Sequence, residues 1–117
     1  MGAPIVHFEI GCKDRKKTAE FYGKLFDWKF ESYGDMPMLE PQGGANSIGG
    51  HINSLGHEPH QYVTIYAEVD DITKYLDKAG KLGGRTIVPA TEVPQMGQFA
   101  WLADPEGNVI GLWKPMQ

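Results

Sequence analysis

The chain has 117 residues, of which 41% are hydrophobic, and its formal net charge is -4. This length allows one domain with a proper core, and the acidic balance argues against general nucleic-acid binding, which needs a basic surface. No apolar run is long enough to predict a membrane-spanning helix, and the N-terminal residues lack the pattern of a signal peptide. The single cysteine, Cys12, excludes an internal disulfide, so we expect a cytoplasmic protein.

The first half of the chain predicts a strand, a helix and three further strands. Apolar and polar side chains alternate along residues 6–10, so His7 and Glu9 share the face opposite the apolar one. Asp14 is a suitable N-cap for an amphipathic helix over residues 15–26. Three strands are expected over residues 28–33, 38–40 and 45–53, with a turn at residues 34–37 and a break at Gly43-Gly44.

The same order of elements returns after a polar connector, residues 54–61. The strand expected over residues 62–69 places Thr64, Tyr66 and Glu68 on one face and apolar side chains on the other. A helix is expected after Asp70-Asp71, and Gly83-Gly84 ends it. Strands follow over residues 85–88, 98–103 and 108–113, with a loop or edge segment at 91–97 and a turn at 104–107.

Identical residues recur at an offset of 57 positions, which indicates an internal duplication. The matches are Val6 with Val63, Asp14 with Asp71, Lys17 with Lys74, and Gly23-Lys24-Leu25 with Gly80-Lys81-Leu82. Neither half has enough elements to close a core alone. We therefore expect one α+β domain, residues 1–117, built of two βαβββ modules (about 4–54 and 61–115) that form a concave sheet with the helices outside.

Several segments together resemble the vicinal oxygen chelate superfamily, which contains glyoxalases, bleomycin-resistance proteins and extradiol dioxygenases. They are the strand VHFEI, the run from Ala19 to Trp28, the Val69-Asp70-Asp71-Ile72 helix start, Leu82-Gly83-Gly84 and the turn Asp104-Pro105-Glu106-Gly107-Asn108. The resemblance implies a small molecule bound in the cup between the two modules. It also implies a homodimer, for which exposed sheet edges give a physical reason.

The resemblance also implies metal ligands in the first and last strand of each half. Carried over, these positions are His7 and His51 in the first half and Thr64 and Gly111 in the second. Threonine is a poor ligand for a transition metal and glycine has no side chain, so the full site is not expected. A site of His7, His51 and one glutamate could still hold Zn, Ni, Fe or Mn with an open position. Otherwise the two histidines are polar pocket residues without metal.

Other polar and aromatic side chains are candidates for the same cup. Glu9 and Glu68 could act as general bases if burial favours their protonated forms, or they could lie solvated at its mouth. The candidate ligand-binding residues are Tyr66, Trp113, Thr64 and Asn53. Aromatic walls suit a planar ligand, although Tyr66 and Trp113 could instead pack between the sheets. His57 and His60 are expected in a solvated loop, and the pattern does not tell which face Phe99 and Trp101 share.

Three functions follow from these alternatives. The first is a metal-free protein that sequesters a small molecule, as bleomycin-resistance members do. The second is a metal-dependent lyase or dioxygenase that acts on a small carbonyl or aromatic substrate. The third is an assembly domain whose cup is filled by its own side chains. The missing ligands favour the first.

Overall fold

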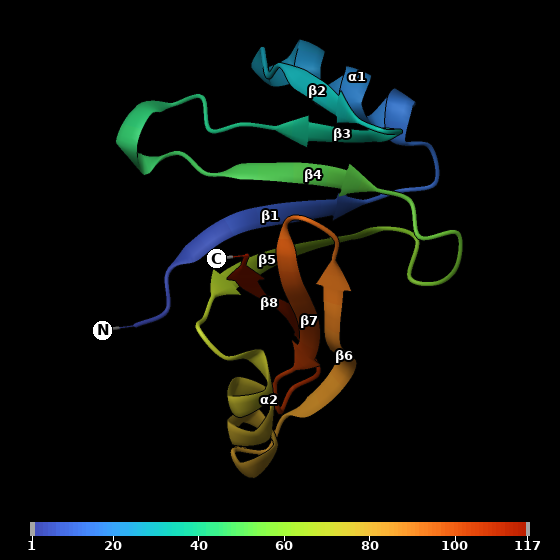
Figure 1. Ribbon diagram of the computed structural model, residues 1–117. Coiled ribbons are helices and arrows are strands. Elements are labelled where there is room, and N and C mark those ends of the chain that lie inside the picture. Colours follow the sequence, from blue (N-terminus) through green and yellow to red (C-terminus); the bar gives the residue numbers. More distant parts are fainter. Residues whose placement is uncertain (1, 117) are drawn as a thin grey trace. The chain divides into compact units, whose positions relative to one another are not determined.

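The computed structural model describes residues 2–116, and its elements follow the order strand, helix, three strands, twice over (Figure 1). The first set is β1 (Ile5–Gly11), α1 (Arg15–Phe26), β2 (Phe30–Tyr33), β3 (Met36–Leu39), a short 3-10 helix η1 (Gly44–Asn46) and β4 (Gly49–Asn53). The second set is β5 (Tyr62–Glu68), α2 (Ile72–Lys81), β6 (Arg85–Val93), β7 (Gly97–Ala103) and β8 (Val109–Pro115). The predicted α+β fold of two βαβββ modules is confirmed. Neither helix in the described part is long and apolar enough to cross a membrane.

The described chain divides into two compact units. The first unit holds residues 7–64, and the second holds residues 2–6 together with residues 65–116. The N-terminal residues belong to the second unit because the backbone N–H of Glu68 donates a 2.9 Å hydrogen bond to the carbonyl of Pro4.

Both units have the same strand topology. In the first unit the order is β2-β3-β4-β1, and the parallel pairing of β1 with β4 places Glu9 opposite His51. In the second unit the order is β5-β8-β7-β6, and the parallel pairing of β5 with β8 places Tyr66 opposite Gly111. The remaining pairs, β2 with β3, β3 with β4, β6 with β7 and β7 with β8, are antiparallel.

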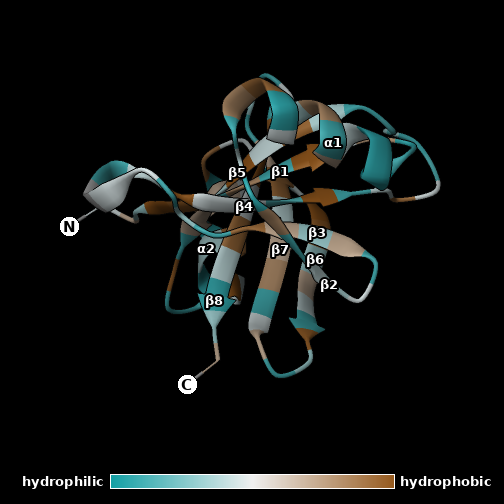
Figure 2. Ribbon diagram, turned by 90° about the horizontal axis from the view of Figure 1, so that it is seen from above, coloured by the Kyte–Doolittle hydropathy of each residue, from teal (hydrophilic) through white to brown (hydrophobic). Residues whose placement is uncertain are grey.

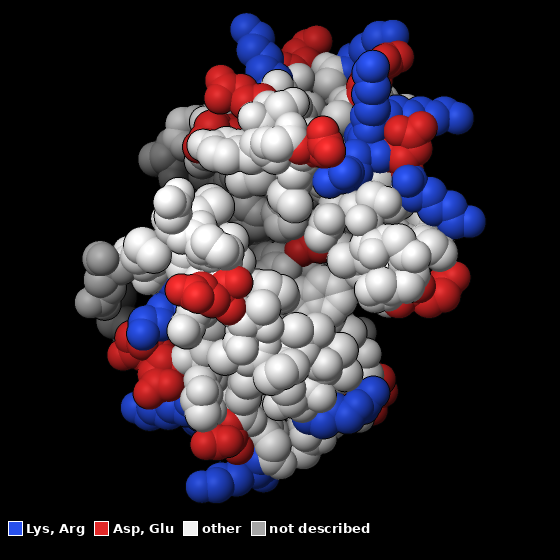
Figure 3. Space-filling view, turned by 45° about the vertical axis from the view of Figure 1, so that its right-hand side comes forward, with Lys and Arg blue, Asp and Glu red and all other residues white. Residues whose placement is uncertain are grey.

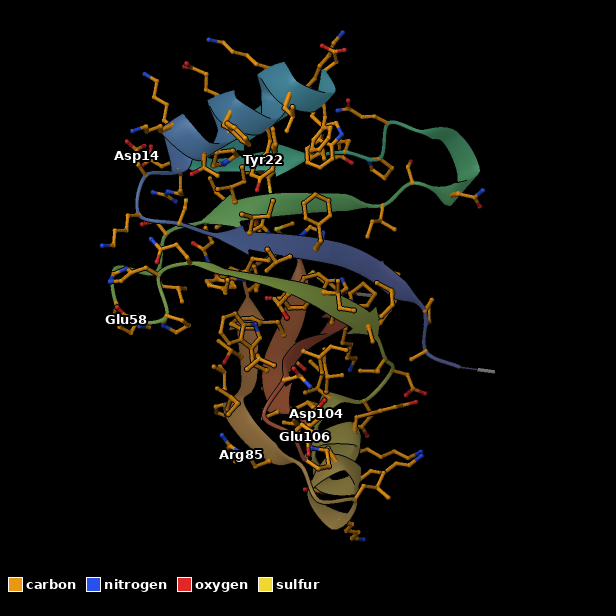
Figure 4. The ribbon with its side chains drawn as sticks, turned by 180° about the vertical axis from the view of Figure 1, so that it is seen from behind. Asp14, Tyr22, Glu58, Arg85, Asp104 and Glu106 are labelled. Atoms are coloured by element: carbon orange, nitrogen blue, oxygen red, sulfur yellow. The ribbon has the colours of Figure 1, made fainter. Side chains whose placement is uncertain are left out.

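Each helix begins at an aspartate, as the sequence predicts. Asp14 accepts a 3.1 Å hydrogen bond from the backbone N–H of Lys17, and Asp71 accepts the equivalent 3.1 Å bond from Lys74. These bonds satisfy N–H groups that the first helical turn leaves without a partner. Figure 4 shows Asp14 at the start of α1. The predicted bounds of α1, residues 15–26, are confirmed.

Each helix packs on strands that follow it in the chain. α1 contacts β3 and β4, while α2 contacts β6, β7 and β8. The second unit has its core here, around Val69, Ile72, Ala100 and Leu112. In the first unit Phe8 and Trp28 make a ring contact beneath α1, and Tyr22 stacks on Trp28. Brown and pale residues alternate along the strands in Figure 2, as expected when one face is covered.

The solvent side of α1 carries mixed charges. Lys and Arg side chains gather with Asp and Glu over α1 in Figure 3. Lys24 and Glu20 form an exposed ion pair of 3.3 Å, one helical turn apart. The same helix leaves Phe21 and Leu25 more than half exposed, so its apolar residues extend beyond the face that covers the strands.

The turn between β7 and β8 forms where the sequence predicts it. Asp104 accepts hydrogen bonds of 2.9 Å from the backbone N–H groups of Glu106 and Asn108 and from the side-chain amide of Asn108. The bonds from Asn108 lower the pKa of the Asp104 carboxyl. Figure 4 labels Asp104 and Glu106 at this turn, and Gly107 has a positive φ of 94° that suits glycine.

Several predicted strand boundaries are wrong. The strand expected from residue 45 begins at Gly49, because residues 44–46 form η1. The strand expected from residue 28 begins at Phe30, and the turn before β3 is shorter than residues 34–37, so Pro37 lies within the strand. β6 continues through Pro89 to Val93, with register shifts between Thr86 and Thr91. An edge strand tolerates proline and bulges because one side of its backbone needs no partner.

The apolar face of β5 is covered less than expected. Val63 is 71% exposed and Ile65 is 40% exposed, whereas Ala67 and Val69 belong to the core region beneath α2. The reason is that α2 packs on β6, β7 and β8.

Candidate functional site

A buried carboxylate lies at the centre of a polar network in the first unit. Glu9 is only 2% exposed. Its partner across the β1–β4 pairing is His51, and paired residues of parallel strands project from the same face. Burying a charged group is costly unless hydrogen bonds compensate.

Side chains from β4 and β5 contact the Glu9 carboxyl group. His51 places Nε2 3.3 Å from Oε1, and Asn53 directs Nδ2 to Oε2 at 3.4 Å. Tyr62 donates its phenolic O–H to the same Oε2. Both carboxyl oxygens therefore contact hydrogen-bonding side chains, which is how a buried acid is retained.

His7 continues this network through His51. Its Nε2 lies 2.6 Å from His51 Nδ1, and the two rings stack with centroids 4.9 Å apart. The pKa of His7 is lowered to about 4, first because burial disfavours the charged imidazole and second because His51 lies beside it. The Glu9 carboxylate acts in the opposite direction. His7 is therefore held as a neutral imidazole near pH 7.

This arrangement does not fit a divalent metal on His7 and His51. Two nitrogens bound to one metal at ~2.0–2.1 Å lie roughly 3 Å or more apart. The distance between His7 Nε2 and His51 Nδ1 is shorter, at 2.6 Å. The other nitrogen of His51 contacts Glu9, and both Glu9 oxygens already have contacts. Within residues 2–116 no group of three His, Cys, Asp or Glu side chains is arranged to hold a metal ion. The described donors instead satisfy one another.

Glycines allow aromatic rings to lie close to the strands of the first unit. A Cβ added at Gly11 would lie 1.9 Å from the Tyr62 ring, and one at Gly50 would lie 2.5 Å from the Phe8 ring. Tyr62 can reach Glu9 because Gly11 leaves this space. Tyr62 is not among the predicted site residues, although it lies two positions before Thr64 and has the same strand parity.

The second unit has aromatic side chains on the face opposite α2. Pairing of β7 with β8 sets Trp101 opposite Gly111 and Phe99 opposite Trp113, which assigns both residues to the face of Tyr66. The Trp101 indole N–H donates a 2.8 Å hydrogen bond to the Tyr66 phenol oxygen. Tyr66 and Trp101 are buried, while Trp113 and Phe99 are half-buried.

The position expected to supply the last metal ligand is occupied by an aromatic ring. A Cβ at Gly111 would lie 2.3 Å from the ring of Tyr66. Tyr66 and Gly111 are paired across β5 and β8 of the second unit. They correspond to Glu9 and His51, which are paired across β1 and β4 of the first. The duplicated positions thus carry an acid–imidazole pair in one unit and a phenol ring over glycine in the other.

The remaining predicted residues lie in several elements. Glu68 is half-buried and lines an open hollow of about 300 Å³ with Asp70, Tyr75 and Lys114. Thr64 is buried in β5. The buried Cys12 thiol lies 3.6 Å from the carbonyl of Asn53, while His57 and His60 both contact Glu58 in the connector.

A family model matches residues 4–112 of the chain, and its description is "Glyoxalase/Bleomycin resistance protein/Dioxygenase superfamily". The chain belongs to this superfamily. This match confirms the resemblance of the sequence segments. It covers both βαβββ sets and thus the strands that carry Glu9, His51 and Tyr66.

Relatives in this superfamily include the "Putative glyoxylase CFP32" of Mycobacterium tuberculosis, 28% identical over 91% of this chain and 43% of that protein. A "Glyoxylase-like domain-containing protein" of Didymella fabae is 27% identical over 89% of this chain and 88% of that protein. This chain therefore spans less than half the length of the first of these relatives. The solved methylmalonyl-CoA epimerase of Mycobacterium tuberculosis shares the fold, with a TM-score of 0.66, 16% identity and coverage of 97% of this chain and 88% of that chain.

Proposed function

We propose that this superfamily member binds a small organic molecule and does so without a divalent metal. The observation that supports this is the buried Glu9 carboxylate, which contacts His51, Asn53 and Tyr62 on the face of the strands opposite the helix. Burying such a group is costly, and a purely structural face could use apolar side chains instead. His7, whose pKa is lowered, belongs to the same network, and perturbed titratable groups concentrate at functional sites.

The polar face of the first unit offers the ligand hydrogen-bonding groups. His7 is held neutral at physiological pH, so it can exchange hydrogen bonds with an uncharged ligand. The second unit offers a different surface, since Trp113 and Phe99 are half-buried and present aromatic rings. Stacking on such rings favours planar ligands. The polar groups of the first unit thus favour ligands with hydroxyl or carbonyl groups, and the aromatic rings of the second unit, taken by themselves, favour planar ones.

The test combines metal analysis with ligand screening of purified protein. Purified protein is expected to hold no stoichiometric metal either before or after dialysis against a chelator, and to be stabilised by a planar ligand from a thermal-shift screen. A ligand at a hundred times its Kd stabilises the folded state by about 2.7 kcal/mol. His7→Ala should abolish the shift, whereas His57→Ala, in the exposed connector, should keep it.

The alternative is a metal-dependent lyase or dioxygenase. About one chelator-sensitive metal ion per chain, lost in His7→Ala and retained in His57→Ala, would contradict our proposal and favour this alternative. Absence of metal together with no ligand shift across the screen would instead favour a domain used in assembly.

A further inference from the structure

The second unit has a hollow of about 300 Å³ where β5 and β8 end and α2 begins. The parallel pairing of β5 with β8 places Glu68 beside Trp113, so both strands end at the same edge of the hollow (Figure 1). The chain then turns into α2, which begins after its N-cap Asp71. The residues that line the hollow include three charged ones, which are Glu68, Asp70 and Lys114.

These three charged side chains do not form ion pairs with one another. The ion pairs described within residues 2–116 join other side chains, and none includes Glu68, Asp70 or Lys114. Glu68 and Lys114 are half-buried, so part of the water that would solvate their charges is excluded. Opposite charges that face the same hollow without direct contact can be satisfied by a molecule that lies between them.

The signs of the charges select the class of ligand. A simple anion would be attracted by Lys114 and repelled by the two carboxylates, whereas a simple cation would be repelled by Lys114. Within residues 2–116 no three His, Cys, Asp or Glu side chains are arranged to hold a metal ion, which argues against a metal here. A molecule with one carboxylate and two cationic groups complements all three charges.

We propose that this hollow binds a free basic α-amino acid such as lysine or arginine. The carboxylate of the amino acid accepts a hydrogen bond from the Lys114 ammonium, and its two cationic groups lie near Glu68 and Asp70. Tyr75 lines the hollow and has a phenol that can donate to the same carboxylate. Val69 adds an apolar wall for the methylene groups of the ligand.

The size of the hollow agrees with a small metabolite. Its volume lies at the lower end of the range for ligand pockets, which is roughly 300–1,000 Å³. The site is also separate from the residues of the proposed function. The Glu9 network belongs to the first unit, and Trp113 and Phe99 are not among the residues that line the hollow.

The test is a titration of the full chain with free lysine, followed through the backbone amide signals in 15N NMR spectra. We expect saturable changes at residues 68–70 and at Lys114. Cadaverine, which is lysine without its carboxylate, should bind about tenfold more weakly because it loses the charge-assisted hydrogen bond to Lys114. Absence of saturable changes at these residues would overturn the proposal, and so would equal affinities for lysine and cadaverine.

Variants of Lys114 test the contact with the carboxylate. Lys114→Gln should weaken lysine binding about tenfold and remove the preference for lysine over cadaverine. Lys114→Arg keeps the charge and should keep the preference. Lys16→Gln makes the same change on the exposed side of α1 and should leave both affinities unaltered. A preference that persists in Lys114→Gln would contradict the assigned contact.

A variant of Glu68 tests the contact with the cationic groups. Glu68→Gln should weaken the binding of lysine and of cadaverine alike, because both ligands carry the groups that this carboxylate attracts. Glu106→Gln, in the exposed turn between β7 and β8, removes the same charge from the second unit and should have no effect. Equal affinities in Glu68→Gln and in the unaltered chain would argue against this site. The planar-ligand screen reports on other residues, so its failure would leave this result standing.

Discussion

The indole N–H of Trp101 donates a 2.8 Å hydrogen bond to the phenol oxygen of Tyr66, and both side chains are buried in the second unit. The bond joins β7 to β5, which are not neighbours in the strand order because β8 lies between them. It therefore links strands across one intervening strand on the face opposite α2.

Tyr66→Phe removes this bond while keeping the ring. We expect the free energy of unfolding to fall by about 1–2 kcal/mol, the usual loss for a buried hydrogen bond. Urea denaturation measures this change. Tyr33→Phe is the matched control, because Tyr33 is 57% exposed and its change should stay within about 0.5 kcal/mol. Equal effects of the two substitutions would contradict the role given to the bond.

Two glycine substitutions are expected to have opposite signs. At Gly111 an added methyl group meets the Tyr66 ring at 2.3 Å, so Gly111→Ala should destabilise the fold by about 1–3 kcal/mol or more through overpacking. At Gly80, in α2, the added group meets no atom within 4 Å. Gly80→Ala should therefore stabilise by up to about 1 kcal/mol. Thermal unfolding of both variants tests the contrast, and a stabilised Gly111→Ala protein would refute it.

The duplicated N-caps should make similar contributions to stability. Asp14→Ala and Asp71→Ala each remove a 3.1 Å hydrogen bond to the third residue of the helix, and each should destabilise by about 1 kcal/mol. Asparagine is an equally good cap, so Asp14→Asn and Asp71→Asn should lie within a few tenths of a kcal/mol of the wild type. Denaturant midpoints of the four variants provide the measurement. Asparagine variants as unstable as the alanine ones would show that charge matters more than capping.

Stability should decrease as the pH falls from about 6.5 to about 4. The pKa of His7 is lowered from 6.5 to about 4, so in this window the unfolded chain binds a proton that folded His7 does not. The unfolded state is thereby favoured, by about 1–3 kcal/mol at the acid end. Above pH 6.5 this contribution is fully present, and below pH 4 it is lost completely.

Urea denaturation at several pH values measures this dependence. His7→Gln should flatten the stability curve between pH 4 and 6.5, whereas His57→Gln, in the exposed connector, should leave its slope unchanged. An unaltered slope in His7→Gln would rule out His7 as its source.

The regular elements could be predicted because local signals specify them. Asp14 and Asp71 mark the starts of the two helices. Alternation along residues 6–10 and 62–69 marks β1 and β5, each of which is the first strand of a parallel pair. The end of β6 beyond Pro89 could not, since proline stops a central strand but is accepted at an edge. Whether a strand lies at an edge depends on pairing with distant segments, which the local sequence does not contain.

The site was predictable as a set of side chains on one strand face, and not as a network. Alternation places His7 and Glu9 together, but the bond between His7 and His51 depends on the register of β1 with β4. A one-residue slip would turn His51 to the other face. Tyr62 reaches Glu9 only because the adjacent position is Gly11, a three-dimensional complementarity that residue spacing does not reveal.

The ring of Tyr66 fills the space that a side chain at position 111 would need. The two positions therefore constrain each other's evolution. A larger side chain at position 111 becomes acceptable only after a smaller residue has replaced Tyr66. A single substitution at either position gives a less stable protein. Introducing a carboxylate at position 111 should therefore require a compensating substitution at position 66. Among homologues the two positions are expected to covary.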